Sequence, residues 1–172
     1  LFAVVECREH PGEHVGYLAK PVGQVQAALV LQTQSAAVRL GQDRGYRRFH
    51  IFGGTGGRFD HTLANLQLLA WLSRREERGW LYGPDWTATA ITGGALEFGP
   101  EHRGMISVFA HSDRARGVTI EGLKYSLSGA ELDNGFSLGV SNEFTGVPSR
   151  VSVEEGTLLI VWERGETCLW NT

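Results

Sequence analysis

Residues 49–72 (FHIFGGTGGRFDHTLANLQLLAWL) constrain the fold of this chain more than any other stretch of its sequence. Residues 49–52 are an apolar run typical of a short buried strand. Residues 53–57 include four glycines, whose backbone can adopt positive φ and lie against a ligand without interference from Cβ atoms. From Phe59 onward, Leu63, Leu66, Leu69 and Leu72 recur at helical spacing. The stretch therefore predicts a strand, a glycine turn and a helix in that order.

Three side chains at the mouth of this turn can carry chemistry. The free N–H groups at the start of a helix favour phosphate, and the planar guanidinium of Arg58 matches a phosphate group. Asp60 can hold a metal ion or accept a proton, and His61 can donate to an oxyanion. On these residues alone, the alternative is a turn that serves packing only, with Asp60 as an N-cap.

Residues 1–92 are predicted to form a Rossmann-like parallel α/β domain. Residues 1–5 favour a buried strand, residues 24–42 favour a helix, and residues 80–91 favour one or two strands with a turn at 83–85. Strand, helix, strand and helix in succession indicate a parallel α/β unit. Residues 7–21 contain Pro and Gly breakers and are expected to be a loop. His10 and His14 would share a face as a metal pair only if that loop were helical.

The pattern changes at Gly93-Gly94, where short alternating runs separated by glycines begin. Such runs are typical of an antiparallel β-sandwich, which is predicted for residues 93–172. The predicted strands are residues 105–110, 118–120, 136–140, 150–153 and 157–162. Within this half, Ser141 and Asn142 supply donors and acceptors suited to a flat heterocycle, and Tyr125 could stack on a ring. The alternatives are an ordinary turn at residues 141–142 and a core aromatic at 125.

Composition narrows the classes of partner and compartment. The net charge of −3 does not favour nucleic acid or an anionic membrane surface, and no apolar run approaches the ~20 residues of a membrane span. Cys7 and Cys168 lie at opposite ends of the sequence and fit no metal or disulfide framework. We therefore expect a reduced, cytoplasmic protein that binds neither nucleic acid nor membrane.

Three motifs resemble the thiamine pyrophosphokinase family. The stretch GGTGGRFDHTLANLQLL is similar to its glycine turn followed by G-R-x-D-H and a helix. Residues 117–127 resemble its G-V-T-x-x-G-L-K-Y-x-L segment, and residues 141–144 resemble its S-N-E-F motif. The motifs occur in the family's order and cover roughly residues 38–162.

The resemblance implies transfer of a pyrophosphoryl group from ATP to thiamine, giving thiamine diphosphate and AMP, with Mg²⁺ and in a homodimer. It implies that Asp60 and Arg58 are catalytic and that Asp60 binds the metal. The implied nucleotide-binding residues are Gly54, Thr55, Gly56, Gly57, Arg58 and His61. The implied thiamine-binding residues are Ser141, Asn142 and Tyr125, near the subunit boundary.

The chain departs from the family pattern in its N-terminal third. The D-G-G, G-D-x-D-S and K-D-x-T-D motifs, which supply most of the magnesium carboxylates, are absent from the sequence. Gln32, Thr33 and Gln34 stand roughly where the last of these acids belong, and neutral side chains do not replace carboxylates on Mg²⁺. The alternative function is therefore a non-catalytic relative that binds thiamine or a nucleotide.

Overall fold

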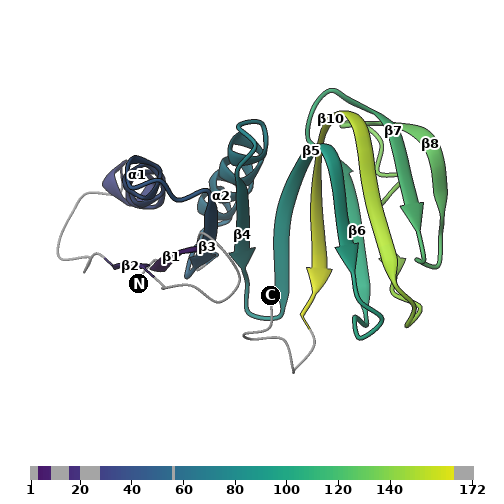
Figure 1. Cartoon of the computed structure of the whole chain (residues 1–172), viewed down its shortest axis with the longest axis horizontal. Coiled ribbons are helices and arrows are strands. Elements are labelled where there is room, and N and C mark those ends of the chain that lie inside the picture. The colour runs from purple at the N-terminus through teal and green to yellow at the C-terminus, as the bar shows by residue number, and fades with distance from the viewer. Residues whose placement is uncertain (1–3, 9–15, 20–27, 56, 165–172) are drawn as a thin grey trace.

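The computed structural model describes residues 4–8, 16–19, 28–55 and 57–164 (Figure 1). Its helices are α1 (Ala28–Asp43) and α2 (Phe59–Ser73). Its strands are β1 (Val4–Arg8), β2 (Gly16–Ala19), β3 (Arg48–Phe52), β4 (Arg78–Tyr82), β5 (Trp86–Phe98), β6 (Met105–Ala110), β7 (Arg114–Glu121), β8 (Leu127–Asp133), β9 (Asn142–Glu143) and β10 (Ser149–Glu163). Within these described ranges the strands join in one sheet ordered β2-β1-β3-β4-β5-β10-β6-β9, with β7 on β10 and β8 on β7.

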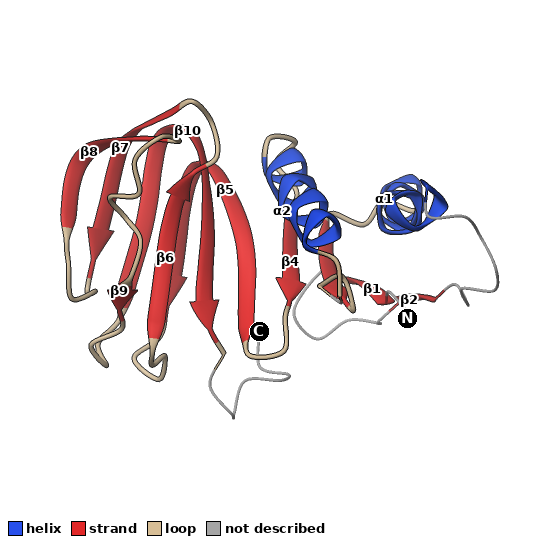
Figure 2. Ribbon diagram, turned by 180° about the vertical axis from the view of Figure 1, so that it is seen from behind, coloured by secondary structure: helices blue, strands red, loops and turns tan. Residues whose placement is uncertain are grey.

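Both helices pack on one face of the sheet, where the apolar residues of β3 and β4 meet them (Figure 2). Phe49 and Ile51 of β3 are fully buried against Val38 of α1 and the leucines of α2. Helix α2 approaches β4 closely because Gly79 has no side chain: a Cβ there would lie 2.8 Å from Leu72 Cδ1. The predicted strand, glycine turn and helix at residues 49–72 are thus confirmed.

The Rossmann-like parallel sheet predicted for the N-terminal part is not what the structure shows. Among the described strands, only β3 and β4 pair in parallel, and the sheet is mostly antiparallel. The predicted loop at residues 7–21 contains β2, which pairs antiparallel with β1. Because β1 is also antiparallel to β3, it lies between two strands that run the same way and breaks the parallel order.

Strands β5 and β10 contribute side chains to two hydrophobic cores, because successive residues of a strand point to opposite faces of the sheet. On one face, Ala88 and Ala90 of β5 pack with the helices. Ile91 of β5 and Leu158 and Ile160 of β10 belong to the second core, between the antiparallel strands. Strand β5 passes without interruption through position 92, so the domain boundary placed there from the sequence stays a prediction.

The paired strands β5 and β10 bend together, which divides the antiparallel region into two layers. The register between them shifts between Val153 and Thr157, opposite Gly93, whose φ is +53°. Beyond the bend β10 pairs with β6, and before it β10 pairs with β7, so the second core is enclosed between the two layers. This arrangement agrees with the antiparallel strands predicted from Gly93 onward.

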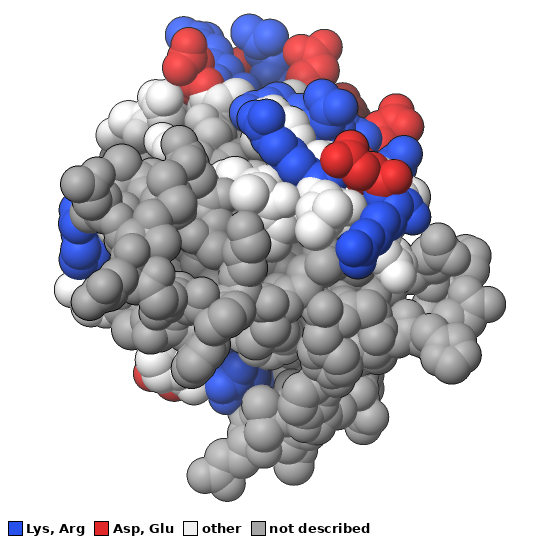
Figure 3. Space-filling model, turned by 90° about the vertical axis from the view of Figure 1, so that its left-hand side faces the viewer, with Lys and Arg blue, Asp and Glu red and all other residues white. Residues whose placement is uncertain are grey.

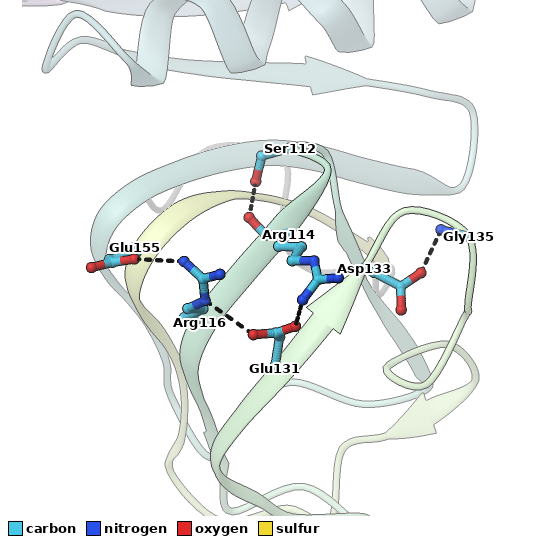
Figure 4. Close-up of polar contacts among 7 residues, drawn as sticks. All are labelled: Ser112, Arg114, Arg116, Glu131, Asp133, Gly135 and Glu155. Carbon is cyan, nitrogen blue, oxygen red and sulfur yellow. Dashed lines mark hydrogen bonds and ion pairs between the residues drawn. The ribbon is translucent and has the colours of Figure 1, made fainter.

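Two details of the antiparallel region differ from the sequence-based expectation. The predicted strand at residues 136–140 is a series of turns, in which Phe136 and Leu138 are exposed. Strand β8 was not predicted, because only Leu132 of its residues is buried and its apolar alternation is weak. An exposed ion-pair network covers β8 instead: Arg116 of β7 lies between Glu131 of β8 and Glu155 of β10 (Figure 4).

At the α1 end of the molecule, positively and negatively charged side chains lie interspersed on the surface (Figure 3). The carboxylate of Glu77, buried between α2 and β4, lies 3.4 Å from Arg47 and accepts a hydrogen bond from Gln42 of α1. A buried carboxylate needs such partners, so this contact ties α1 to the start of β4.

No helix in the described part of the chain is long and apolar enough to cross a membrane.

The bend in β10 generates a prediction about Gly156. Its φ is +92°, and a Cβ there would lie 2.5 Å from the Arg114 carbonyl oxygen and 2.7 Å from Ser112 Oγ. We expect Gly156→Ala to lower the free energy of unfolding by about 3 kcal/mol, since left-handed strain and overpacking add. Urea denaturation followed by circular dichroism measures the loss.

Gly45 provides the matched control, because its φ is also +92° and a Cβ there would meet nothing within 4 Å. Gly45→Ala should cost only the backbone strain, about 1–2 kcal/mol. Equal losses in the two variants would show that close packing at the bend of β10 is unimportant.

Candidate functional site

The glycine turn between β3 and α2 is held by buried polar side chains. Asn65 of α2 donates a hydrogen bond from Nδ2 to the Gly54 carbonyl oxygen at 2.7 Å. A Cβ on Gly54 would lie 2.8 Å from that Nδ2 and 3.1 Å from Gln34 Nε2. Gly53 and Gly57 have φ of +68° and +74°, a region that favours glycine. The turn therefore requires glycine for both conformation and close approach.

Asn65 and Gln34 were not among the residues singled out from the sequence. Both are buried, and both lie where α1 and α2 meet the glycine turn. The signal that could have found Asn65 is a polar residue on the helical face that otherwise carries leucines. Of the predicted nucleotide-binding residues, Gly56 lies outside the described residues. His10 and His14, which were considered as a metal pair, also lie outside them.

Arg58 and Asp60 form an ion pair with each other at the start of α2. Arg58 Nη2 lies 2.5 Å from Asp60 Oδ2, and Arg58 Nε lies 3.1 Å from Asp60 Oδ1. Both side chains are more than half exposed, and Arg58, at the N-cap position, makes no side-chain capping bond. The hydrogen bond from Arg58 lowers the pKa of Asp60 below its ordinary value. A carboxylate that resists protonation suits cation binding better than proton acceptance.

The start of α2 is open to solvent and holds a further polar group. Phe59 is 80% exposed, so the first-turn N–H groups, which have no intrahelical acceptor, lie near the surface. His61 Nε2 is buried and has no hydrogen-bond partner among the described residues. A buried ring nitrogen without a partner is costly unless a ligand or solvent satisfies it.

The second predicted site gathers Ser141, Asn142 and Tyr125 at the far end of the sheet. Asn142 is buried, and its Oδ1 accepts hydrogen bonds from the N–H groups of Tyr125 and Glu143, each at 2.9 Å. Its Nδ2 donates to the Tyr125 carbonyl oxygen at 2.6 Å. The amide of Asn142 thus holds the chain in place, and only one of its hydrogens remains for a ligand.

Ser141 and Tyr125 are the accessible members of this second site. Ser141 has a φ of +61°, uncommon for a residue other than glycine, and its N–H donates to Ser107 Oγ at 3.2 Å. Such a conformation persists only where the surroundings hold it, and it is frequent at binding sites. Tyr125 is 60% exposed, which excludes the core role considered from the sequence.

The two sites do not meet within one chain. Strand β9, which carries Asn142, lies five strand positions from β3 in the order β3-β4-β5-β10-β6-β9. At about 4.8 Å per strand, that separation is roughly 24 Å along the sheet. Figure 2 shows β9 and α2 on opposite sides of β5 and β10. The described residues also contain no group of three or more His, Cys, Asp or Glu that could hold a metal ion.

Fold and sites together define a mostly-β protein with a glycine turn at one end, between β3 and α2, and a polar loop at the other, in which Ser141 has a positive φ. Residues 97–158 match the family model of the thiamin pyrophosphokinase vitamin B1 binding domain. The chain is 30% identical over 112 residues to a thiamine pyrophosphokinase of Bacillus subtilis. The resemblance found in the sequence motifs is confirmed: over these ranges the chain is similar to thiamine pyrophosphokinases.

Solved structures show a similar fold. The crystal structure of thiamine pyrophosphokinase from Bacillus subtilis superposes with a TM-score of 0.71 at 25% identity, covering 77% of this chain and 63% of that one. The enzyme from Geobacillus thermodenitrificans gives a TM-score of 0.67 at 24% identity, covering 80% and 63%. The match to the Bacillus subtilis sequence covers 64% of this chain and 52% of the relative, so the chain spans about half of that relative's length.

The ion pair at the start of α2 generates a prediction about titration. Arg58→Gln should raise the pKa of Asp60 toward its ordinary value, because the bidentate hydrogen bond is lost. Since pairing lowers the folded-state pKa, its stabilising effect is present above about pH 4 and is lost as pH falls further. Carboxyl ¹³C chemical shifts measured against pH report the change.

Arg103→Gln is the control for this titration. Arg103 is an exposed arginine whose guanidinium donates to the carbonyl oxygens of Pro100 and His102. Its substitution should leave the titration of Asp60 unchanged. An Asp60 curve that is the same in Arg58→Gln and the parent protein would mean that the pair does not persist in solution.

Proposed function

We propose that this chain transfers a pyrophosphoryl group from ATP to thiamine, giving thiamine diphosphate and AMP. The supporting observation is a strand, glycine turn and helix with the exposed side chains of Arg58 and Asp60 at its mouth, in a chain similar to thiamine pyrophosphokinases. In the reaction, the thiamine hydroxyl oxygen forms a bond to the β-phosphorus of ATP. The bond from that phosphorus to the α,β-bridging oxygen breaks, AMP leaves, and the proton of the thiamine hydroxyl passes to solvent.

Positioning and neutralisation of phosphate charge are the main requirements of this chemistry. The N–H groups of the glycine turn and of the first turn of α2 would bind phosphate oxygens. Arg58 is exposed enough to exchange its contact with Asp60 for a phosphate, and His61 Nε2 would gain the partner it lacks. Ser141 and Tyr125 would hold thiamine.

Asp60 is the residue that would hold Mg²⁺ at this site. Its carboxylate is exposed and its pKa is lowered, so the group is ionised at neutral pH. A single carboxylate fits the mode in which substrate phosphates and water supply most ligands of Mg²⁺. When bound, the ion would neutralise phosphate charge during transfer. Arg58 would then turn from Asp60 to the phosphates, which keeps the carboxylate and phosphate oxygens from repelling each other.

The separation of the two sites supports a homodimer. ATP and thiamine must touch to react, yet the strands that carry the glycine turn and the Ser141 loop of one chain are five positions apart, roughly 24 Å measured along the sheet. A second copy that brings its glycine turn to the Ser141 loop resolves this conflict. The proposed reaction centre is therefore composed of residues from both subunits.

One observation favours the alternative, a relative that binds thiamine or nucleotide without turnover. Gln34 is a buried residue within α1, near the glycine turn, at the place where the family carries acids. Neutral amides there leave Asp60 to neutralise the phosphates with little help. AMP release measured during Mg²⁺ titration, with ATP and thiamine present, separates the enzyme from the binding protein.

Asp60→Asn tests the proposed reaction directly. We expect AMP release to fall about 10²-fold or more, the usual scale for losing a positioned catalytic group. Thermal stability should change little, since Asp60 is exposed and makes no capping bond that Asn could not replace. Asp43→Asn, at the end of α1 and before β3, is the control and should retain full activity. Undiminished turnover by Asp60→Asn would refute the assigned role.

The dimer is tested by sedimentation. Analytical ultracentrifugation at micromolar concentration should give a mass near twice the 18.9 kDa of the chain. If the protein is a dimer with composite sites, mixing Asp60→Asn with Ser141→Ala should restore activity, because some dimers then hold one intact site. A monomer at that concentration would contradict the proposal.

A further inference from the structure

The backbone that carries the exposed side chain of Tyr125 is held by several hydrogen bonds. The side-chain amide of Asn142 accepts a hydrogen bond from the N–H of Tyr125 and donates one to the carbonyl oxygen of Tyr125. The N–H of Lys124 donates to the Glu143 carbonyl oxygen at 3.0 Å. Leu123 and Phe144 form a further β-bridge beside them. The segment between β7 and β8 is therefore clamped to the S-N-E-F loop, while the aromatic face of Tyr125 stays open to solvent.

A cation already lies at this face. Lys124 Nζ is 2.8 Å from Glu143 Oε2 and 5.8 Å from the centre of the Tyr125 ring. The three groups form an internal complex: an ammonium ion held between a carboxylate and an aromatic ring. All three side chains are about half exposed or more, so a molecule from solution can reach them.

We propose that Lys124 is an internal substitute for the cationic ring of a ligand, which displaces it and takes its place between Glu143 and Tyr125. This inference rests on the proposed function, in which the ligand is thiamine. The thiazolium ring of thiamine is planar and permanently charged. It can therefore lie on an aromatic face while its charge remains close to a carboxylate.

The exchange is favourable for reasons of hydration and geometry. An exposed lysine–carboxylate pair contributes little to stability, so the protein loses little when it opens. The released ammonium is compact and strongly hydrated, and its flexible stem lets it turn into solvent. A planar ring covers more of Tyr125 than an ammonium group does, and it keeps its charge at every pH. Glu143 raises the pKa of Lys124, so the internal cation is present whenever the ligand arrives.

The ordinary interpretation of the same contacts is a surface salt bridge with no role in binding. The two interpretations predict opposite results for removal of the lysine charge. A salt bridge that only orders the site predicts unchanged or weaker ligand binding in Lys124→Met. A displaced competitor predicts tighter binding, because the ligand no longer has to expel the ammonium from Glu143.

The test is isothermal titration calorimetry of the full chain with thiamine and with the neutral thiazole that lacks its pyrimidine and its charge. Lys124→Met, which keeps the stem and removes the charge, should bind thiamine about 3- to 10-fold more tightly. Glu143→Gln should bind it at least 10-fold more weakly. The affinity for the neutral thiazole should be the same in the parent protein and both variants.

Arg116→Met is the matched control, because it also removes an exposed cation from a pair of glutamates (Figure 4). Arg116 precedes the end of β7 by five residues, about 17 Å of strand, so its loss should leave thiamine affinity unchanged. Unchanged or weaker thiamine binding by Lys124→Met would overturn the inference, as would equal tightening in Arg116→Met. Absence of thiamine binding in the parent protein would overturn it as well.

Turnover separates this inference from the proposed function. If Lys124→Met tightens thiamine binding but no chain releases AMP from ATP, the cation site stands and the transferase function fails. If AMP is released and Lys124→Met binds thiamine no more tightly than the parent, the function stands and the displacement of Lys124 is wrong.

Discussion

The alternation of side chains along β5 and β10 is the constraint on which the rest of the structure depends. Ala88 and Ala90 pack in the core that holds α2, whereas the next residue, Ile91, belongs to the core between the antiparallel layers. A hydrogen bond also links the C-terminal end of α2 to β5: Ser73 Oγ donates to Thr92 Oγ1 at 2.8 Å. The glycine turn at the start of α2 is thereby positioned by strands that also form the walls of the second core.

The sequence predicted most strands and both helices, and it failed where structure depends on partners distant in the chain. The apolar run of β3 and the leucine spacing of α2 are local signals, and they gave nearly the observed bounds. The direction of β1 is not local: it follows from β2, which lies in a segment that Pro and Gly residues made resemble a loop. Strand β8 lacks an apolar face because its exposed side is covered by ion pairs rather than by packing.

The candidate site was predicted to a similar extent and for similar reasons. Residue types revealed the glycine turn, Arg58 and Asp60, but only the three-dimensional arrangement shows that the two charges pair with each other. Asn65 escaped notice because its hydrogen bond to Gly54 spans eleven residues and depends on how α2 packs. Asn142 matched a family motif, yet its amide contacts backbone groups seventeen residues away.

The continuous strands β5 and β10 also determine how this molecule can move. Many transferases close one domain over another to exclude water from the reacting phosphates, and such closure needs a flexible joint between separate bodies. Here, within the described residues, the helical end and the antiparallel end share two long strands that belong to both cores. Bending one end against the other would disrupt both cores, so the proposed phosphate transfer would have to be shielded from water by small side-chain exchanges or by the approach of another molecule.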